Sequence, residues 1–281
     1  MWPSLFRALL AVPWMFLWVI PLTAAMHLPA ELATPTLAAL TALFVWRNVV
    51  RPRRSRPRTA AMFRLTPWRQ YIGWVSAAAI AQFAVMFATV RLHEQLAEWR
   101  LLPKLPGTPD IIPSHFLGHA LGLVATFVAV VILTPLVEEF ACRGKMQYRL
   151  EHALGVVPAI AIPAVIFSLL HGLTIAIHQL PFALFVGWLV WRTASIWPAV
   201  YVHALNNTAV LVLIYLRGES APYEPPSPWL WPSAIVIGLL GLGGLLTAAS
   251  RINRLAQRSA RNVASSGHGP ANNQLSPVAR G

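Results

Sequence analysis

The chain has 281 residues, of which 57% are hydrophobic and only 11% are charged. A soluble domain carries about 25% charged residues, so this composition excludes an ordinary soluble protein and indicates one that crosses a membrane. The formal net charge of +13 would suit nucleic-acid binding, but the cations gather in segments between apolar runs, which favours membrane topology and excludes nucleic acid as a partner.

Apolar segments along the chain predict the membrane-spanning helices. A helix needs about 20 mostly apolar residues to cross the hydrocarbon core of a bilayer. Segments of this kind lie at residues 5–27, 32–49, 71–91, 115–138, 155–171, 176–195, 197–216 and 229–249. We therefore expect an all-α, polytopic membrane helix bundle of about eight transmembrane helices, located in the cell membrane.

Basic residues follow the second, fourth and eighth predicted spans, so all three groups fall on one side of the membrane. Cytoplasmic loops carry an excess of Lys and Arg, which predicts that this side is cytoplasmic and that both termini lie there. The loops 93–114 and 217–228 are then extracytoplasmic. The basic residues are Arg51, Arg53, Arg54, Arg56, Arg58, Arg64, Arg69, Arg143, Lys145, Arg149, Arg251, Arg254, Arg258 and Arg261.

Two adjacent carboxylates, Glu138 and Glu139, follow the apolar run of the fourth span, and Arg143 comes four residues after Glu139. Successive helical side chains turn by about 100°, so we expect the two glutamates to face different partners. The spacing of Glu139 and Arg143 favours an ion pair, which leaves Glu138 to face a cavity. Intramembrane acids usually line a functional site, so Glu138 is a candidate general base. The alternative is that both glutamates lie in the headgroup region and cap the helix.

Later apolar segments supply two histidines and an amide. His171 ends the fifth span, where a lone histidine is often a core residue rather than a ligand, whereas His203 and Asn207 share one face of the seventh span. A histidine exchanges a proton near neutral pH, and an Asn amide can hydrogen-bond a developing oxyanion. His115 and His119 lie more than about 25 Å from the carboxylates along the fourth span and are interpreted as interfacial histidines.

Three motifs lie in order on successive apolar segments: Glu138-Glu139-x-x-x-Arg143, Phe167-x-x-x-His171 and His203-x-x-x-Asn207. This ordered set resembles the CPBP family of intramembrane proteases. That family includes the CAAX prenyl endopeptidases and bacterial proteins linked to bacteriocin processing and self-immunity. The resemblance covers roughly residues 115–216, and the earlier spans match only as generic helices.

The resemblance implies hydrolysis of a peptide bond inside a membrane cavity. Glu138 would activate a water molecule, and His171 would help to position or polarise it. His203 and Asn207 would stabilise the oxyanion of the tetrahedral intermediate. Glu139, paired with Arg143, would hold its helix in register.

A divalent metal such as zinc is an open question at this stage, and no other cofactor is expected. If a metal is bound, Glu138, His171 and His203 are its candidate ligands, since three protein ligands and one water are typical of catalytic zinc. The sequence lacks a His-Glu-x-x-His helix pair, which favours a metal-independent glutamate mechanism.

The chain divides into three predicted parts. Residues 1–114 form N-terminal transmembrane helices with a basic cytoplasmic loop at 51–70, residues 115–250 form the catalytic core, and residues 251–281 form a basic, disordered cytoplasmic tail. The expected partners are the lipid bilayer and a membrane-associated protein or peptide substrate, with a lipidated substrate among the candidates. The sequence does not predict the oligomeric state.

Two other functions remain open at the level of sequence. Intramembrane Glu and His residues could form the proton relay of a transporter, although no inverted repeat is visible and the buried charge is confined to one half. The chain could also be a catalytically silent immunity or assembly partner in the membrane that retains the same residues for structure.

Overall fold

The computed structural model describes residues 2–52, 63–64, 68–102, 120–217 and 230–265. Within these ranges every regular element is a helix, which confirms the all-α fold class. The N-terminal elements are α1 (Trp2–Leu9), α2 (Ala11–Met26), α3 (Ala30–Val45), the π-helical turn η1 (Trp46–Val50), the short η2 (Arg69–Tyr71) and α6 (Ile72–Glu98).

The second half of the chain begins with one continuous helix from Ala120 to Leu154 and then adds four more. The continuous helix consists of α8 (Ala120–Thr126), η3 (Phe127–Leu133), α9 (Thr134–Glu139), η4 (Phe140–Gln147) and α10 (Tyr148–Leu154). The helices after it are α11 (Val156–Leu170), α12 (Leu173–Thr193), α13 (Trp197–Arg217) and α14 (Leu230–Ser265).

Six helical segments of the described chain are long and apolar enough to cross a membrane, which confirms a multi-pass membrane protein. The other two predicted spans, 32–49 and 155–171, are also helical, as α3 with η1 and as the shorter apolar helix α11. The total number of crossings stays a prediction. The six segments are Leu5–Met26, Arg69–Glu98, Ala120–Leu154, Ile175–Thr193, Trp197–Leu216 and Trp231–Arg261.

The continuous helix Ala120–Leu154 contains the fourth predicted span and is called the fourth helix below. It continues well past residue 138, where that predicted span ends. Arg143 Nη2 donates to the Ala183 carbonyl at 2.9 Å, and Gln147 Nε2 donates to the Gly187 carbonyl at 2.9 Å. Both donors and both acceptors are four residues apart, so a ladder of polar contacts joins η4 to α12. Because the side chains of Arg143 and Gln147 find hydrogen-bond partners inside the bundle, the helix can continue past them without leaving buried polar groups unpaired.

Two π-helical stretches, η3 and η4, flank α9 within this helix. A π-helical turn shifts the register of the residues that follow it and is frequent at functional sites. The glutamate pair at 138 and 139 therefore lies on a short α-helical segment whose orientation is set by the irregular turns on both sides.

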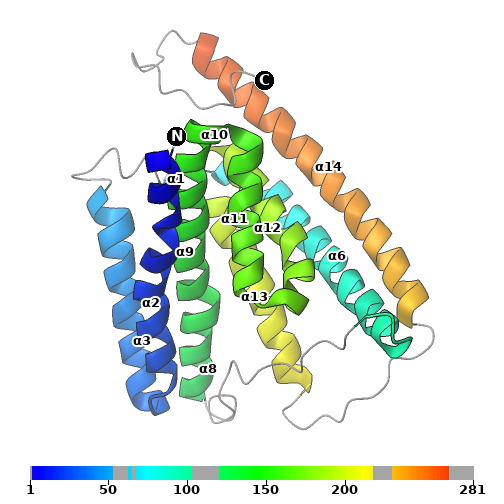
Figure 1. Ribbon diagram of the computed structural model, residues 1–281, viewed down its shortest axis with the longest axis horizontal. Helices are drawn as coiled ribbons and strands as arrows, with labels where there is room; N and C mark the ends of the chain where they lie inside the picture. The colour runs from blue at the N-terminus through cyan, green and yellow to red at the C-terminus, as the bar shows by residue number, and fades with distance from the viewer. Residues whose placement is uncertain (1, 53–62, 65–67, 103–119, 218–229, 266–281) are drawn as a thin grey trace.

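The bundle is arranged with α2, α3 and the fourth helix on one side, α11, α12 and α13 in the middle, and α6 beside α14 on the other side (Figure 1). One apolar core cluster includes Trp18 of α2, Phe44 of α3 and Phe140 of η4. A second core joins Val75 of α6 and Val186 of α12 to residues of α13 and α14. The candidate site lies where the middle helices meet the fourth helix.

Small residues bring α6 and α14 close together. A Cβ atom added to Gly241 of α14 would lie 2.8 Å from the Ala81 carbonyl oxygen, and one added to Gly238 would lie 2.9 Å from the Ala88 Cβ atom. Such small-residue contacts are typical of helix pairs in membranes, because they allow the backbones to approach.

Gly241→Ala is therefore expected to destabilise the protein by about 1–3 kcal/mol relative to Gly243→Ala, through overpacking against α6. Gly243 is the matched control, because a Cβ atom there meets nothing within 4 Å and the gain in helix propensity is the same. Thermal unfolding of both variants in the same bicelles measures the difference. Equal midpoints would show that α6 yields at the contact without cost.

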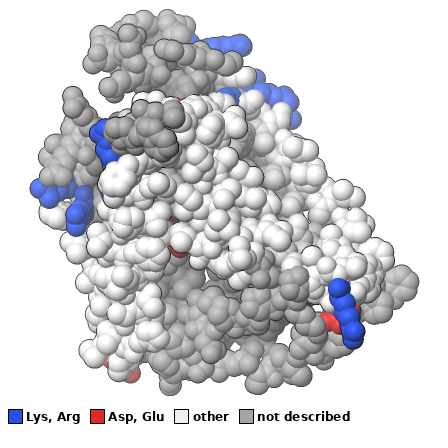
Figure 2. Space-filling model, in the orientation of Figure 1, with Lys and Arg blue, Asp and Glu red and all other residues white. Residues whose placement is uncertain are grey.

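The start of α1 and the end of α14 lie at the same end of the bundle, together with the end of α3 and with α10 (Figure 1). Lys and Arg side chains also gather at that end on the visible face (Figure 2). This arrangement agrees with an even number of crossings. The assignment of that end to the cytoplasm stays a prediction.

Helix α14 reaches Ser265, whereas the predicted disordered tail begins at residue 251. The extension is stabilised because Ile252 and Ala256 are buried in the same core as Tyr71 and Val75. Most of the predicted basic loop 51–70, the proline-containing segment 103–119 with His115 and His119, and residues 266–281 lie outside the described residues.

Candidate active site

Glu139 and Arg143 form an ion pair at the centre of the bundle. Arg143 Nη1 lies 3.1 Å from Glu139 Oε1, and the two side chains are 1% and 0% exposed, respectively. The Arg143 guanidinium also lies 5.0 Å from the centroid of the Phe167 ring. The ion pair expected from the i,i+4 spacing is thus present and is enclosed by protein.

His203 of α13 lies between the two glutamates. Its Nδ1 atom is 2.9 Å from Glu139 Oε1, and its Nε2 atom is 3.6 Å from Glu138 Oε2. The first contact is a hydrogen bond with the carboxylate as acceptor, so the proton is on Nδ1 and Nε2 faces Glu138. The second distance is too long for a hydrogen bond but close enough for an electrostatic interaction.

The expectation that Glu138 and Glu139 face different partners is therefore wrong. Rotation by about 100° per residue separates their Cβ directions, but an imidazole has nitrogen atoms on two sides of its ring. One ring placed across the helix can meet a carboxylate on each side. Their environments still differ, because the Glu139 side chain is fully buried and the Glu138 side chain is 14% exposed.

His171 is the C-cap residue of α11. Its Nδ1 atom donates to the Phe167 carbonyl at 2.8 Å, which leaves Nε2 as the available acceptor of the neutral ring. The Phe167 ring lies 4.6 Å from the His171 ring and 5.8 Å from the His203 ring. His171 and His203 both interact electrostatically with Glu138. Phe167 thus contacts both imidazoles that act on this carboxylate.

Asn207 lies one turn beyond His203 on α13 and bonds to the main chain of the fourth helix. Its Nδ2 atom donates to the Val130 carbonyl of η3 at 2.8 Å. One amide N–H is occupied in this way, and the second N–H and the Oδ1 atom are not part of that bond. The contact also ties α13 to the π-helical stretch that precedes the glutamates.

Glu138 and Glu139 each have a buried oxygen atom, Oε2, without a hydrogen-bond partner among the described residues. A buried carboxylate oxygen is costly to leave unpaired, and such atoms are often found where a site handles a proton or a substrate. Glu138 Oε2 is the one that faces His203 Nε2.

The residues do not form a metal site in this arrangement. Within the described part of the chain, no three His, Cys, Asp or Glu side chains are placed so as to hold a metal ion. Of the candidate ligands, His203 has its Nδ1 atom bonded to Glu139 and His171 has its Nδ1 atom bonded to the Phe167 carbonyl, while both rings contact the Phe167 ring. No step of the reaction is therefore derived through a metal.

Several residues around the site have no signal in the sequence analysis. The Phe182 ring of α12 lies 5.3 Å from the His203 ring, edge to face, and so helps to fix the imidazole between the carboxylates. An isolated Phe in an apolar helix looks like any other core residue. In the structure, Phe182 directly precedes Ala183, whose carbonyl binds Arg143, but the sequence alone does not indicate that contact.

A buried histidine pair outside the candidate site also had no signal in the sequence. His178 Nε2 lies 3.3 Å from His93 Nδ1, and both side chains are buried between α12 and α6. The predicted third span ends at residue 91, which placed His93 in a loop, whereas α6 continues to Glu98. The pair shows that α6 carries an ionisable residue inside the bundle.

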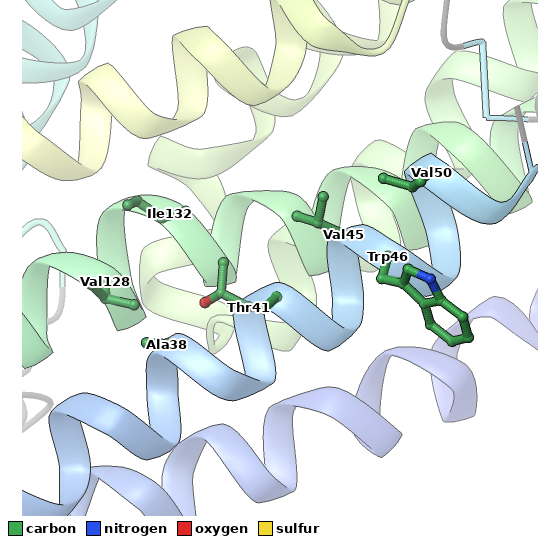
Figure 3. Close-up of a pocket in the computed structure, with 8 residues that line it drawn as sticks. Ala38, Thr41, Val45, Trp46, Val50, Val128 and Ile132 are labelled. Atoms are coloured by element: carbon green, nitrogen blue, oxygen red, sulfur yellow. The ribbon is translucent and has the colours of Figure 1, made fainter.

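An open apolar pocket of about 500 Å³, which neither glutamate lines, lies between α3 with η1 and the η3 stretch (Figure 3). Its lining is aliphatic and aromatic apart from Thr41, so it has no groups for acid–base chemistry. The lining residues are Ala38, Thr41, Ala42, Val45, Trp46, Val50, Val128 and Ile132.

Comparison with known proteins finds a similarity in the region that contains the site. The family model for the Rce1-like group, described as type II CAAX prenyl endopeptidase Rce1-like, matches residues 120–209. No curated protein and no solved structure matches the chain. The matched range runs from the start of the fourth helix to two residues past Asn207, and so includes all three motifs. The match over residues 120–209 thus supports a CPBP family intramembrane protease.

Proposed function

We propose that the protein hydrolyses a peptide bond in a membrane-associated protein or peptide, with Glu138 as the base that activates water. The observation that carries this proposal is the position of His203 between two carboxylates, hydrogen-bonded to Glu139 and 3.6 Å from Glu138 Oε2. A carboxylate that orients an imidazole toward a second reactive group is the arrangement used in many hydrolases.

The charges of the cluster support proton exchange at this place. With Glu138, Glu139 and Arg143 all ionised, the three side chains carry one excess negative charge. A proton taken up by His203 or by Glu138 neutralises that excess, so the buried cluster can accept one proton without an uncompensated charge. Activation of one water molecule releases one proton.

In the proposed reaction, the water oxygen attacks the carbonyl carbon of the scissile bond as its proton passes to Glu138. The carbonyl oxygen becomes an oxyanion, to which the second N–H of Asn207 would donate, and His203 Nε2 would join it by sharing the one proton that Glu138 has taken up. Collapse of the intermediate breaks the C–N bond, and the proton on Glu138 passes to the leaving nitrogen. One peptide and one water yield a carboxylic acid and an amine.

His171 and the Glu139–Arg143 pair act as positioning groups in this account. With Nδ1 bonded to the Phe167 carbonyl, His171 can accept the second hydrogen of the attacking water through Nε2. Glu139 keeps the His203 proton on Nδ1, and Arg143 fixes Glu139 while binding the Ala183 carbonyl of α12. Precise placement of such groups supplies much of a catalytic rate.

The family description makes a prenylated C-terminal peptide the first substrate to test. A prenyl chain anchors the peptide in the bilayer, where each buried CH₂ group contributes about 0.8 kcal/mol of binding. We expect the full chain in proteoliposomes to cleave a farnesylated peptide with a kcat/KM at least about tenfold above that of the same peptide without the lipid.

Quantification of both peptides by mass spectrometry checks this expectation. Equal cleavage of the two peptides would reject the prenylated substrate class while leaving the endopeptidase function in place. Failure to cleave either peptide, or any other membrane-anchored peptide in a library of varied sequence, would contradict the proposed function itself.

A further inference from the structure

Four cations from three helical parts of the chain converge at the end of the bundle where α1 begins. Lys145 of η4 interacts electrostatically with Arg149 of α10 and with Arg47 of η1, and Arg149 in turn interacts with Arg7 of α1. These four residues are called the basic cluster below. Lys145 and Arg149 are one turn apart on the same helix, and the fold brings them together with Arg7 and Arg47, which are distant in sequence.

Within the described part of the chain, three of these four cations have no acidic partner. No carboxylate of the described residues lies within ion-pair distance of Arg47, Lys145 or Arg149. The acid nearest in sequence, Glu151 of α10, instead binds Arg64 and accepts a hydrogen bond from Gln147. Like charges that face one another without a counter-charge destabilise a fold, so an anion bound among them would be stabilising.

The cluster is held in place by packing and is not a set of loose surface chains. Lys145 Nζ lies 4.2 Å from the centroid of the Trp14 ring and 6.0 Å from the centroid of the Phe63 ring. Arg149 donates from Nη1 to the Arg7 carbonyl at the end of α1. Two of the cations are half-buried, and Arg7 and Arg47 are exposed. A ligand can therefore reach a partly preformed site.

The surroundings of the cluster suit the interface of a bilayer. Trp residues are enriched at the headgroup level of membranes, and Trp14 and Trp46 both lie near the cluster, with Arg51 stacked 5.7 Å from the Trp46 ring. The apolar pocket of Figure 3 extends along α3 from η1, the same turn that carries Arg47. Charge and apolar surface thus adjoin at this turn.

We propose that the basic cluster binds the phosphate group of an anionic phospholipid of the adjoining leaflet, with an acyl chain of that lipid in the apolar pocket. Phosphate oxygens accept hydrogen bonds from Arg and Lys, and a headgroup at this depth neutralises the facing cations. A free phosphate ion would match the charges but not the apolar pocket. The site is separate from the glutamates, since Lys145 lies about 10 Å from Glu138 along the helix.

Native mass spectrometry of the full chain with phosphatidylglycerol or phosphatidylcholine tests the proposal. We expect preferential retention of phosphatidylglycerol, and retention about fivefold weaker for each charge removed in Arg47→Gln/Lys145→Gln. Arg258→Gln/Arg261→Gln on the exposed face of α14 is the matched control, with the same loss of charge. Lys145→Arg keeps the charge and should keep the lipid.

Thermal unfolding in the same lipids gives a second readout. Phosphatidylglycerol should raise the unfolding midpoint of the wild type and of the control double variant Arg258→Gln/Arg261→Gln (the control pair). It should not raise the midpoint of the double variant Arg47→Gln/Lys145→Gln (the cluster pair). If the cluster pair does not fold, Arg47→Gln alone replaces it, because that side chain is exposed. If the cluster pair and the control pair lose phosphatidylglycerol retention equally, the effect comes from general surface charge and the proposal is overturned. An equal shift with inorganic phosphate in neutral detergent would assign the cluster to a free anion and overturn it as well.

Discussion

Glu138→Gln is expected to lower kcat/KM for peptide hydrolysis by about 10²–10⁴-fold, the range that a general base contributes. The glutamine amide keeps the size and shape of the carboxylate, but it cannot take the proton of the attacking water. Glu138 Oε2 has no hydrogen-bond partner among the described residues, so the substitution removes none of the bonds seen there. Initial rates of cleavage in proteoliposomes measure the loss.

Glu31→Gln provides the matched control for this experiment. Glu31 lies in the first turn of α3, where its side chain is exposed, and the chemical change is the same. We expect that variant to keep the wild-type rate, and we expect both variants to unfold at the wild-type temperature. Retention of more than about a tenth of the wild-type rate by Glu138→Gln would remove this residue from the role of general base.

Arg143→Ala is expected to destabilise the protein by about 3–5 kcal/mol, the cost of leaving one partner of a buried ion pair alone. Glu139 is fully buried, and the substitution would also leave the Ala183 carbonyl without its donor and the Phe167 ring without its cation. Unfolding in mixed micelles, followed by circular dichroism, measures the change in the free energy of unfolding.

Arg91→Ala is the comparison for that measurement. Arg91 pairs with Glu94 at 2.7 Å, but the two side chains are 21% and 23% exposed. An ion pair of this kind contributes about 0–1 kcal/mol, so we expect a far smaller effect. Glu139→Gln in the Arg143→Ala background should recover part of the stability, because it removes the uncompensated charge. Equal losses at the two arginines would contradict a buried structural role for Arg143.

Hydropathy alone predicted the class of the fold, because long apolar segments have few alternatives to membrane helices. It misplaced the ends of three of them, one of which is α14, whose helix continues to Ser265. The span before the glutamates continues to Leu154 because Arg143 and Gln147 bind backbone carbonyls of α12, and α6 reaches Glu98 because His93 pairs with His178. A hydropathy average counts polar residues but cannot detect partners on other helices.

The ordered motifs on the second half of the chain selected the residues that the bundle brings near Glu138. Spacing along one helix was sufficient for the Glu139–Arg143 pair, since i,i+4 neighbours meet in any helix. Spacing was not sufficient for His203, whose contacts with both carboxylates depend on the relative rotation of α9 and α13. That rotation is set by π-helical turns and by the Asn207 contact with Val130, which no local pattern reveals.

The most direct test of the account is hydrolysis of a farnesylated peptide in ¹⁸O-labelled water, with the products analysed by mass spectrometry. If Glu138 activates water for attack on the scissile carbonyl, the wild type will place one ¹⁸O atom in the new carboxylate, and Glu138→Gln will form almost no labelled product. Labelled product at wild-type rates from the Gln variant would contradict the account.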